Sequence, residues 1–506
     1  MIRLERHSTL VQALVLAILA VLPYLPALSH DFVYDDGGSI AENRFLAESS
    51  AWEQVLSLRV FTRSSVPDGR RPLVILSYLL DRAMWGVKPF GYHLTNLLWH
   101  AGCVLLFFAL MRLLAKPGTS IIPFAAALLF ALHPVASEAV LVPAFREDLL
   151  CGFFLLGFLL AGLRGSLFAL PLLAAALLSK ESAVLGPLLL AWIWACHPAR
   201  TAARPRWRVL LPAVVLTAGF ALSWALLGGL QAVSFGQEGV GLAFPSNWLT
   251  LPGLWLKTLR YLAWPWPLIA DHIIPPVTTW QSSGFLGGTA ILWAWVVAAL
   301  ACRNRFPRLA LGLGWILLGF APVSNAVPLF NPFAERYLYF PAAGAALLAA
   351  GALDRIPRPA VRWGLLVVLA AGGFALISLR RPDWANDALL WDKTLRQEPR
   401  SARAHTWTGL ARKHTGDRDA ARRLFEQADQ LNPRDTTALI NLAVMSGEEG
   451  RLEEAVTLLQ EAIRRRPDKP EAYQNLAVAL KALGREPEAA RLRPTPAARA
   501  PLPPAP

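Results

Sequence analysis

Charged residues are scarce in this sequence. Asp, Glu, Lys and Arg make up 17% of the 506 residues, whereas hydrophobic residues make up 55%. A soluble protein of this length carries more charge and lacks repeated apolar runs of about 20 residues, so the composition excludes an ordinary soluble enzyme. Because a membrane segment must satisfy its own backbone hydrogen bonds, and because these runs do not alternate, they predict transmembrane helices rather than a barrel.

Cysteine and the motifs of soluble catalysis are also lacking. The four cysteines lie in or beside apolar runs without paired spacing, which indicates neither disulfides nor a zinc site. The sequence contains no Walker loop and no G-x-G-x-x-G, G-x-S-x-G or H-E-x-x-H pattern, so soluble nucleotide-using enzymes have no support. The net charge of +14 is spread over short loops and a polar C-terminal region, and no basic face with interleaved aromatics predicts a nucleic-acid partner.

Apolar runs predict an all-α, polytopic membrane domain of about eleven transmembrane helices. The predicted spans are 9–28, 94–114, 119–136, 149–163, 165–178, 182–196, 209–228, 285–301, 309–324, 338–353 and 362–379. With the N-terminus inside, every inside loop carries Arg or Lys, as the positive-inside rule requires. The pair Arg380-Arg381 does not fit, because this count places it outside. The run 248–274, with internal Lys257 and Arg260, is expected to lie in the interface; a membrane crossing is the alternative.

A repeat begins after the last predicted span. Gly416, Gly450 and Gly484 are spaced by 34 residues, and Ala421 and Ala455 follow at the same period. This period and the small and large residues at its fixed positions match the tetratricopeptide template of two antiparallel helices. We therefore expect a membrane domain over 1–382, an extracytoplasmic tetratricopeptide-repeat α-solenoid over 383–493, and a disordered Pro/Ala-rich tail over 494–506.

Polar residues capable of chemistry gather in the loops of the predicted outer face. Asp35 and Asp36 directly follow the first span, in FVYDDGGS, where one carboxylate can act as a general base on a membrane-borne substrate. D-D-G-G is also good turn chemistry, which is the alternative. Further outer candidates are Arg71, Glu138, Arg146, Asp148, Lys180, Glu335, Arg336 and Tyr337. Cations that converge on one face can clamp a phosphate, whereas single ones are usually solvated or bound in structural ion pairs.

One helical stripe also carries polar residues. His93, Asn96 and His100 lie at i, i+3 and i+7 in YHLTNLLWH. A stripe of hydrogen bonds between helices is the expected role, and a metal site is the weaker alternative.

Several of these segments, taken in order, resemble one known family. FVYDDGGSI, RRPLVILSYLLDRAMWGVKPFGYHLTNLLWH, LHPVASEAV, LSKES and AERYLYFPA, followed by tetratricopeptide repeats, are similar to the transmembrane and tetratricopeptide-repeat O-mannosyltransferases. The resemblance extends to their bacterial relatives and, more distantly, to other GT-C glycosyltransferases. It implies a GT-C-like membrane fold and inverting transfer of a sugar, mannose or another hexose, from a polyprenyl-phosphate donor to an acceptor hydroxyl.

The resemblance also implies roles for the candidate residues. It assigns catalysis to Asp35, Asp36 and Glu138, donor-phosphate binding to Lys180, Arg336 and Arg146, and support to Asp148, Glu335, Tyr337, His93 and Arg71. It leaves open which of the two neighbouring aspartates is the base. No cofactor is required, and a divalent metal held by the two aspartates is not indicated.

The short repeat array leaves the acceptor open. Ser or Thr of a protein held by the repeats is one acceptor, a lipid or glycan is another, and a non-enzymatic scaffold is the third reading. The Arg-, Ala- and Pro-rich composition suggests a bacterial inner membrane, with the repeats in the periplasm.

Overall fold

Helices account for the regular secondary structure of the chain. A computed structural model describes residues 2–63, 66–115, 121–197, 207–226, 242 and 244–492, and no strand occurs among them, which confirms the all-α prediction. Two compact units are present. The membrane module comprises the described residues before Asp387 except Asp271–Ile273, and the repeat unit comprises Asp271–Ile273 and the residues from Asp387 onward. The tail predicted at 494–506 lies outside the described residues.

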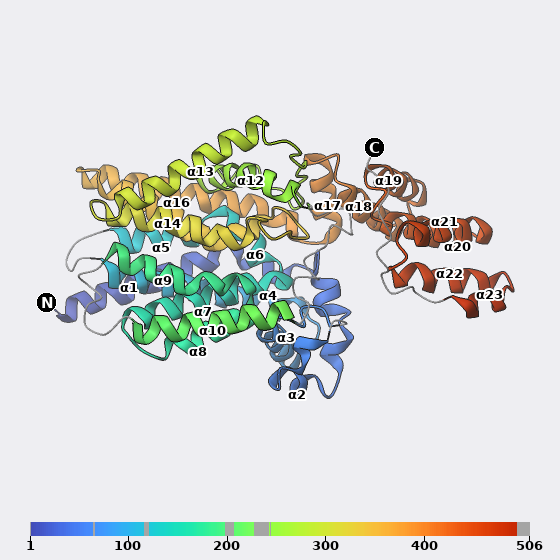
Figure 1. The fold of residues 1–506 in the computed structure, drawn as a ribbon, viewed down its shortest axis with the longest axis horizontal. Helices are drawn as coiled ribbons and strands as arrows, with labels where there is room; N and C mark the ends of the chain where they lie inside the picture. Colours follow the sequence, from blue (N-terminus) through green and yellow to red (C-terminus); the bar gives the residue numbers. More distant parts are fainter. Residues whose placement is uncertain are drawn as a thin grey trace. The chain divides into compact units, whose positions relative to one another are not determined.

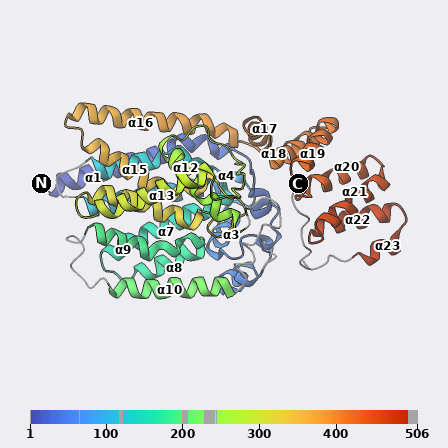
Figure 2. The ribbon, with the colours of Figure 1, turned by 45° about the horizontal axis from the view of Figure 1, so that its top comes forward.

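α-Helices of very different lengths form most of the membrane module (Figure 1). They are α1 (Ile2–Val21), α2 (Ala51–Leu56), α3 (Pro72–Trp85), α4 (Pro89–Leu114), α5 (Ile122–Ala131), α6 (Ser137–Leu141), α7 (Arg146–Leu163), α8 (Ala169–Ser179), α9 (Gly186–Cys196), α10 (Trp207–Leu226), α12 (Ser246–Ala263), α13 (Ser283–Cys302), α14 (Pro307–Phe320), α15 (Tyr339–Asp354) and α16 (Pro359–Arg380). Among them, α4 packs on α1, α5 and α7, and α15 packs on α5 and α14. Figure 2 shows α8, α9 and α10 side by side next to α7.

Each predicted span coincides with a helix, but the number of spans is not confirmed. Among the described residues, six helical segments are long and apolar enough to cross a membrane, or seven if the bent pair that includes α5 and α6 is one span. Three shorter apolar segments contain α8, α9 and α14. α7 begins with three charged residues, Arg146, Glu147 and Asp148, at the end nearest the predicted outer face. Apolar runs therefore predict where the helices lie more reliably than how many of them cross.

α12 and the segment after it differ from the other apolar helices. α12 is not among the candidate spans of the described chain and carries two cations near its end. Lys257 lies 4.9 Å from the ring centre of Phe333, and Trp248 and Trp264 are exposed. Exposed Trp beside Lys and Arg is typical of a helix at a membrane interface. The interfacial position of this region stays a prediction.

The misfit cation Arg380 has a local explanation. Its guanidinium lies 2.7 Å from the Glu335 carboxylate, and both side chains are buried. Arg381 donates a hydrogen bond to the carbonyl of Pro23 at 2.9 Å. Arg380 therefore acts as one half of an ion pair inside the membrane module, and a paired cation carries little topological information.

Successive helical hairpins form the repeat unit after one leading helix. The helices are α17 (Asp387–Gln397), α18 (Ala402–His414), α19 (Arg418–Leu431), α20 (Thr437–Glu448), α21 (Leu452–Arg465), α22 (Pro470–Ala482) and α23 (Glu486–Arg491). Side chains cap two of them: Ser401 Oγ accepts from the Ala404 N–H at 2.9 Å, and Asp417 Oδ1 accepts from the Ala420 N–H at 3.1 Å.

The 34-residue glycine period has a backbone cause. Gly416, Gly450 and Gly484 follow the first helix of successive hairpins with φ of 86°, 78° and 75°. Only glycine adopts this left-handed conformation without strain, so it ends the helix and turns the chain into the next one. Within the first hairpin, a side chain at Gly409 would collide with the ring of Phe425, at 2.7 Å from its nearest atom. These contacts confirm the repeat predicted from the period.

Candidate functional site

The two neighbouring aspartates after the first span have different environments. Asp36 is fully buried, and its carboxylate accepts hydrogen bonds from the Val33 N–H at 3.0 Å and the Ala144 N–H at 2.6 Å. Asp36 thus fastens the first outer loop to the turn that precedes α7. Asp35 is exposed. The acid pair is therefore divided into one carboxylate that holds the loop and one that is accessible.

Lys180 lies at the end of α8 and pairs with the first turn of α7. Its ammonium is 2.6 Å from Asp148 Oδ1 and 3.8 Å from Glu147 Oε1, and all three side chains are largely buried. Burial lowers the pKa of Lys180, but the carboxylates of Asp148 and Glu147 raise it above its usual value. Lys180 is therefore a permanent cation at neutral pH. Glu181, its neighbour in the sequence, does not share this pairing.

Arg71 joins the same group of charges from the start of α3. Its guanidinium contacts Asp68 at 3.2 Å, Glu147 at 3.3 Å and Glu181 at 3.1 Å. Glu147 Oε1 therefore lies between Arg71 and Lys180. The ion pairs connect the first outer loop, α7 and the turn after α8, which are up to 110 residues apart in the sequence. We call Asp68, Arg71, Glu147, Asp148, Lys180 and Glu181 the outer charge cluster.

Arg336 forms a second ion pair that adjoins the outer charge cluster. Its side chain lies 2.5 Å from Glu138 Oε1, and its backbone N–H donates to Glu138 Oε2 at 2.8 Å. The ring centre of Tyr337 is 5.2 Å from the Arg336 guanidinium and 5.5 Å from the Lys180 ammonium. One aromatic ring thus contacts two of the three cations, Lys180 and Arg336, that the family resemblance assigns to donor phosphate.

Phe145 brings the Asp36 loop to the same place. The guanidinium of Arg336 lies 3.9 Å from the ring centre of Phe145, and Tyr34 contacts the same ring edge-on at 5.4 Å. The preceding residue, Ala144, donates to Asp36. The loop that carries Asp36 therefore lies beside Arg336. A catalytic role for the two aspartates stays a prediction.

Three predicted site residues lie elsewhere. Arg146 is fully buried and pairs with Asp81 at 2.6 Å, and its other N–H groups donate to Asn96 and Ser77 and to a backbone carbonyl. It braces α7 against α3 and α4, so its guanidinium is engaged by structural partners. Glu335 accepts from the Ile269 N–H at 2.5 Å and pairs with Arg380. His93 is buried against His30, with ring centres 6.2 Å apart.

A metal site gains no support from geometry. No group of three or more His, Cys, Asp or Glu side chains in the described parts of the chain is arranged to hold a metal ion. In the stripe of α4, His100 bonds to Tyr339 at 2.9 Å and Asn96 donates to the carbonyl of Val142 at 3.2 Å. The stripe therefore contributes hydrogen bonds between segments.

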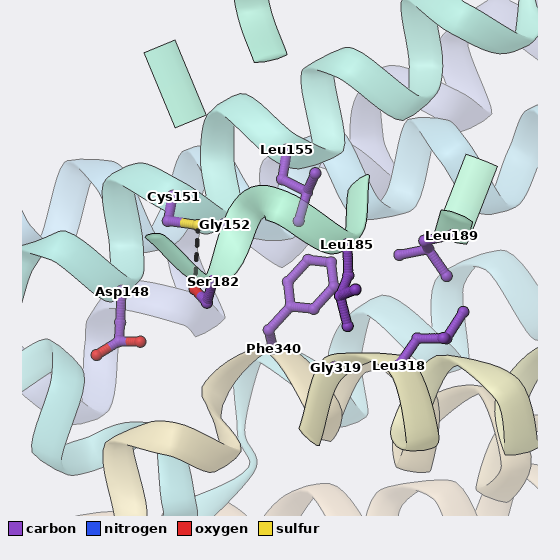
Figure 3. Close-up of a pocket in the computed structure, with 10 residues that line it drawn as sticks. All are labelled: Asp148, Cys151, Gly152, Leu155, Ser182, Leu185, Leu189, Leu318, Gly319 and Phe340. Atoms are coloured by element: carbon purple, nitrogen blue, oxygen red, sulfur yellow. Dashed lines mark hydrogen bonds between the residues drawn. The ribbon is translucent and has the colours of Figure 1, made fainter. Parts of the chain in front are cut away.

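An apolar pocket begins at the outer charge cluster. It is a small pocket, partly open to the surroundings, between α7, α9, α14 and the start of α15. Asp148 is at one end in Figure 3, and leucine side chains are at the other. Its lining residues are Asp148, Cys151, Gly152, Leu155, Ser182, Leu185, Leu189, Leu318, Gly319 and Phe340. The pocket therefore offers a charged entrance and an apolar interior, which suits an amphipathic ligand.

Comparisons with known proteins agree with this architecture. The family model described as TPR repeat matches residues 448–484. The chain is 26% identical to protein O-mannosyl-transferase F38B6.6 of Caenorhabditis elegans, covering 83% of this chain and 62% of that protein. It is 25% identical to Tmtc3 of Drosophila melanogaster, covering 89% and 58%. It is 26% identical to TMTC4 of Mus musculus, covering 81% and 65%.

The chain is a homologue of the TMTC O-mannosyltransferases. This confirms the resemblance drawn from the sequence motifs. The chain spans between 58% and 65% of the length of these three relatives.

Sequence reasoning missed three members of the outer charge cluster in this TMTC homologue. The sequence gives no reason to single out Asp68, and it assigns neither Glu147 nor Glu181 to the site. Asp68 and Arg71 are i, i+3 in VPDGRRP, which is the one local signal. Because Lys180 and Glu181 are adjacent, the sequence suggests that they pair with each other. In the structure, Lys180 pairs with Asp148 and Glu181 pairs with Arg71.

Arg146, which braces α7, predicts a loss of folding stability that depends on its ion-pair partner Asp81. Arg146→Met leaves the Asp81 carboxylate buried without its cation, which we expect to cost about 3–5 kcal/mol of folding free energy. Adding Asp81→Asn should recover part of that loss. Thermal unfolding in detergent measures both effects, with Arg164→Met, exposed at the other end of α7, as the control. Equal losses in the single and double variants would contradict the pairing.

Asp68 predicts a pH effect. Its pKa is raised to about 6, because burial and the nearby carboxylates raise it more than Arg71 lowers it. Between about pH 4 and pH 6 the folded state therefore holds a proton that the unfolded state has lost, so Asp68 destabilises the fold increasingly as pH rises and fully above pH 6. We expect Asp68→Asn to raise the thermal midpoint at neutral pH and to change it little below pH 4. A difference independent of pH would contradict this assignment.

Proposed function

We propose that this chain is a glycosyltransferase that moves a sugar from a polyprenyl-phosphate donor to a Ser or Thr hydroxyl of a protein, on the extracytoplasmic face of a membrane. The names of its relatives, protein O-mannosyl-transferases, support the reaction class and the acceptor. The observation that carries the proposal is a chain of contacts beside an apolar pocket. Asp36, the neighbour of Asp35, is bonded to Ala144, and the ring of the next residue, Phe145, contacts Arg336. Tyr337 contacts both Arg336 and Lys180, and Asp148, which pairs with Lys180, lines the pocket. By composition, the proposed location is a bacterial inner membrane, with the repeats outside it.

The pocket supports a lipid-linked donor. An isoprenoid chain would lie along Leu185, Leu189 and Leu318, where each buried CH₂ group contributes about 0.8 kcal/mol. The donor phosphate would then lie at the Asp148 end, near Lys180 and Arg336. Both cations are held by carboxylates, so the phosphate must share or replace those contacts.

The transfer step assigns roles to the aspartates. The acceptor oxygen attacks the anomeric carbon while its proton passes to the Asp35 carboxylate. The bond from the anomeric carbon to the phosphate oxygen breaks with its electron pair, and the departing polyprenyl phosphate carries the additional negative charge. Lys180 and Arg336 stabilise that charge electrostatically. Asp36, held by two backbone N–H groups, positions its neighbour.

A catalytic base at Asp35 predicts a selective loss of rate. Asp35→Asn should lower kcat by about 10²–10⁴-fold and leave the thermal midpoint unchanged, because the side chain is exposed. Asp36→Asn should lower the thermal midpoint as well, since an amide cannot accept from both N–H groups. The measurement is transfer of labelled sugar from a panel of polyprenyl-phosphate hexoses to a Ser/Thr peptide by the purified full chain.

Asp31→Asn is the matched control, because Asp31 is an exposed carboxylate in the same loop. If Asp35→Asn keeps full activity while Asp36→Asn folds normally but is inactive, Asp36 and not Asp35 is the base. If the wild-type chain transfers no sugar from any donor in the panel to a peptide or a protein, the proposed reaction is excluded.

The donor pocket predicts an effect on KM. Leu318→Trp places a larger ring in the pocket and should raise the KM for a long-chain polyprenyl donor by about tenfold, with little change in kcat. A donor with a single isoprenoid unit, too short to extend to Leu318, should be affected much less. Leu188→Trp adds the same ring at an exposed position next to the pocket residue Leu189 and is the control. Equal effects on both donors would contradict this pocket as the lipid site.

A further inference from the structure

A tight turn in the first outer loop carries Asp35. The Asp36 N–H donates to the Val33 carbonyl at 3.0 Å, and the Asp36 carboxylate accepts from the Val33 N–H at 3.0 Å. These two bonds close a β-turn whose central residues are Tyr34 and Asp35. Asp35 is exposed, whereas its neighbours on both sides are buried. The conformation of the turn therefore determines where the Asp35 side chain points.

Tyr34 has a backbone conformation that is unfavourable for its residue type. Its φ is 59°, in the left-handed region, and Asp35 is not among the residues with positive φ. A positive φ at the first central position alone is the pattern of a type II′ turn, in which glycine is favoured. In a bulky residue such a φ is an outlier, and outliers of this kind persist only where the surrounding contacts enforce them.

Two aromatic rings provide contacts that enforce this conformation. The buried Tyr34 ring contacts Phe145 edge-on, with ring centres 5.4 Å apart, and lies 6.4 Å from the ring centre of Trp384. Trp384 is fully buried in the turn that follows α16. The next residue, Ala385, accepts a hydrogen bond from the Asp31 N–H at 3.0 Å. Contacts with two later segments of the membrane module therefore hold the turn.

We propose that Tyr34 is a positioning residue for the proposed transfer reaction, because its ring holds the strained turn that orients Asp35. The Phe145 ring that Tyr34 contacts also lies 3.9 Å from the Arg336 guanidinium, so the turn is fixed relative to a cation that stabilises the departing phosphate. Burial and, among the nearby charges, the Asp35 carboxylate raise the pKa of Asp68, so Asp35 acts on the outer charge cluster. The inference rests on the proposed function, since it takes Asp35 to be the base.

Three substitutions separate the ring from the backbone conformation. Tyr34→Phe keeps the ring, Tyr34→Gly loses it but adopts a positive φ freely, and Tyr34→Ala loses it and disfavours that φ. The loss of kcat should be smallest for Tyr34→Phe and largest for Tyr34→Ala, which should lie about tenfold below Tyr34→Gly. KM for the donor and for the peptide should change little. If the ring only filled space, Tyr34→Gly would lose at least as much kcat as Tyr34→Ala, which would overturn the inference.

Leu58 and Asp35 supply the controls. Leu58 lies in the same outer loop with the same φ of 59°, and its side chain is exposed, so Leu58→Ala should leave kcat unchanged. In the Asp35→Asn background, Tyr34→Ala should cause little further loss of rate, because the carboxylate that it orients is absent. A further loss as large as in the wild-type background would contradict a role through Asp35.

Hydrogen–deuterium exchange tests the turn without any sugar transfer. In the full chain in detergent, exchange in the segment 31–36 should be fastest in Tyr34→Ala, intermediate in Tyr34→Gly and slowest in the wild type, because the Val33 and Asp36 N–H groups are protected by the turn. Equal exchange in the wild type and Tyr34→Ala would overturn the inference and leave the proposed function intact. So would faster exchange without a loss of kcat. If the wild-type chain transfers no sugar, the proposed function fails, and the order of exchange still decides whether Tyr34 holds the turn.

Discussion

Opposite charges are buried together near the ends of apolar helices, and the arrangement of the membrane module depends on this pairing. Four of these ion pairs are largely or fully buried: Lys180 with Asp148, Arg336 with Glu138, Arg380 with Glu335, and Arg146 with Asp81. A charge removed from water without a partner costs several kcal/mol, so each cation determines which distant segment must lie beside it. The pairs join segments between 32 and 198 residues apart.

These pairs divide into two kinds according to what surrounds them. Arg146 is fully buried, and Asn96, Ser77 and a backbone carbonyl accept three further hydrogen bonds from it, so it acts as a brace. Lys180 and Arg336 instead share the ring of Tyr337 and adjoin an apolar pocket. Both kinds consist of the same residue types in polar segments of the same predicted face. Only the surroundings distinguish a structural arginine from a candidate ligand, and the family resemblance, which assigns a phosphate contact to Arg146, carries no information about them.

The sequence predicted local features well because local physics determines them. Apolar runs place the helices, and the 34-residue period identifies glycines whose left-handed φ only glycine adopts without strain. Pairing is different, because partners are chosen by packing across the whole fold. The sequence therefore could not show that Lys180 pairs with Asp148, that Glu181 pairs with Arg71, or that Asp36 accepts from Ala144. Nor could it settle the number of spans, since α8, α9 and α14 are short and partly buried against neighbours.

Charge balance constrains how a phosphate could enter the outer charge cluster. The cluster contains two cations, Arg71 and Lys180, and four carboxylates, so it is negative by two charges when all of them are ionised. An anionic donor would be repelled unless a carboxylate takes up a proton or moves away from its cation. Asp68, with a pKa of about 6, can hold such a proton close to neutral pH.

In the proposed reaction, the attraction that brings the donor in must therefore come largely from its apolar chain in the pocket. The cations contribute most when the phosphate gains negative charge on leaving, because that increase occurs beside them in a site from which water is largely excluded. In this arrangement the lipid chain supplies the binding energy for the donor, and the cations stabilise the transition state more than the bound donor. Only interactions that are stronger in the transition state raise kcat, whereas equally strong ones raise only the affinity for the donor. A cluster with spare cations would bind the product phosphate tightly and slow its release.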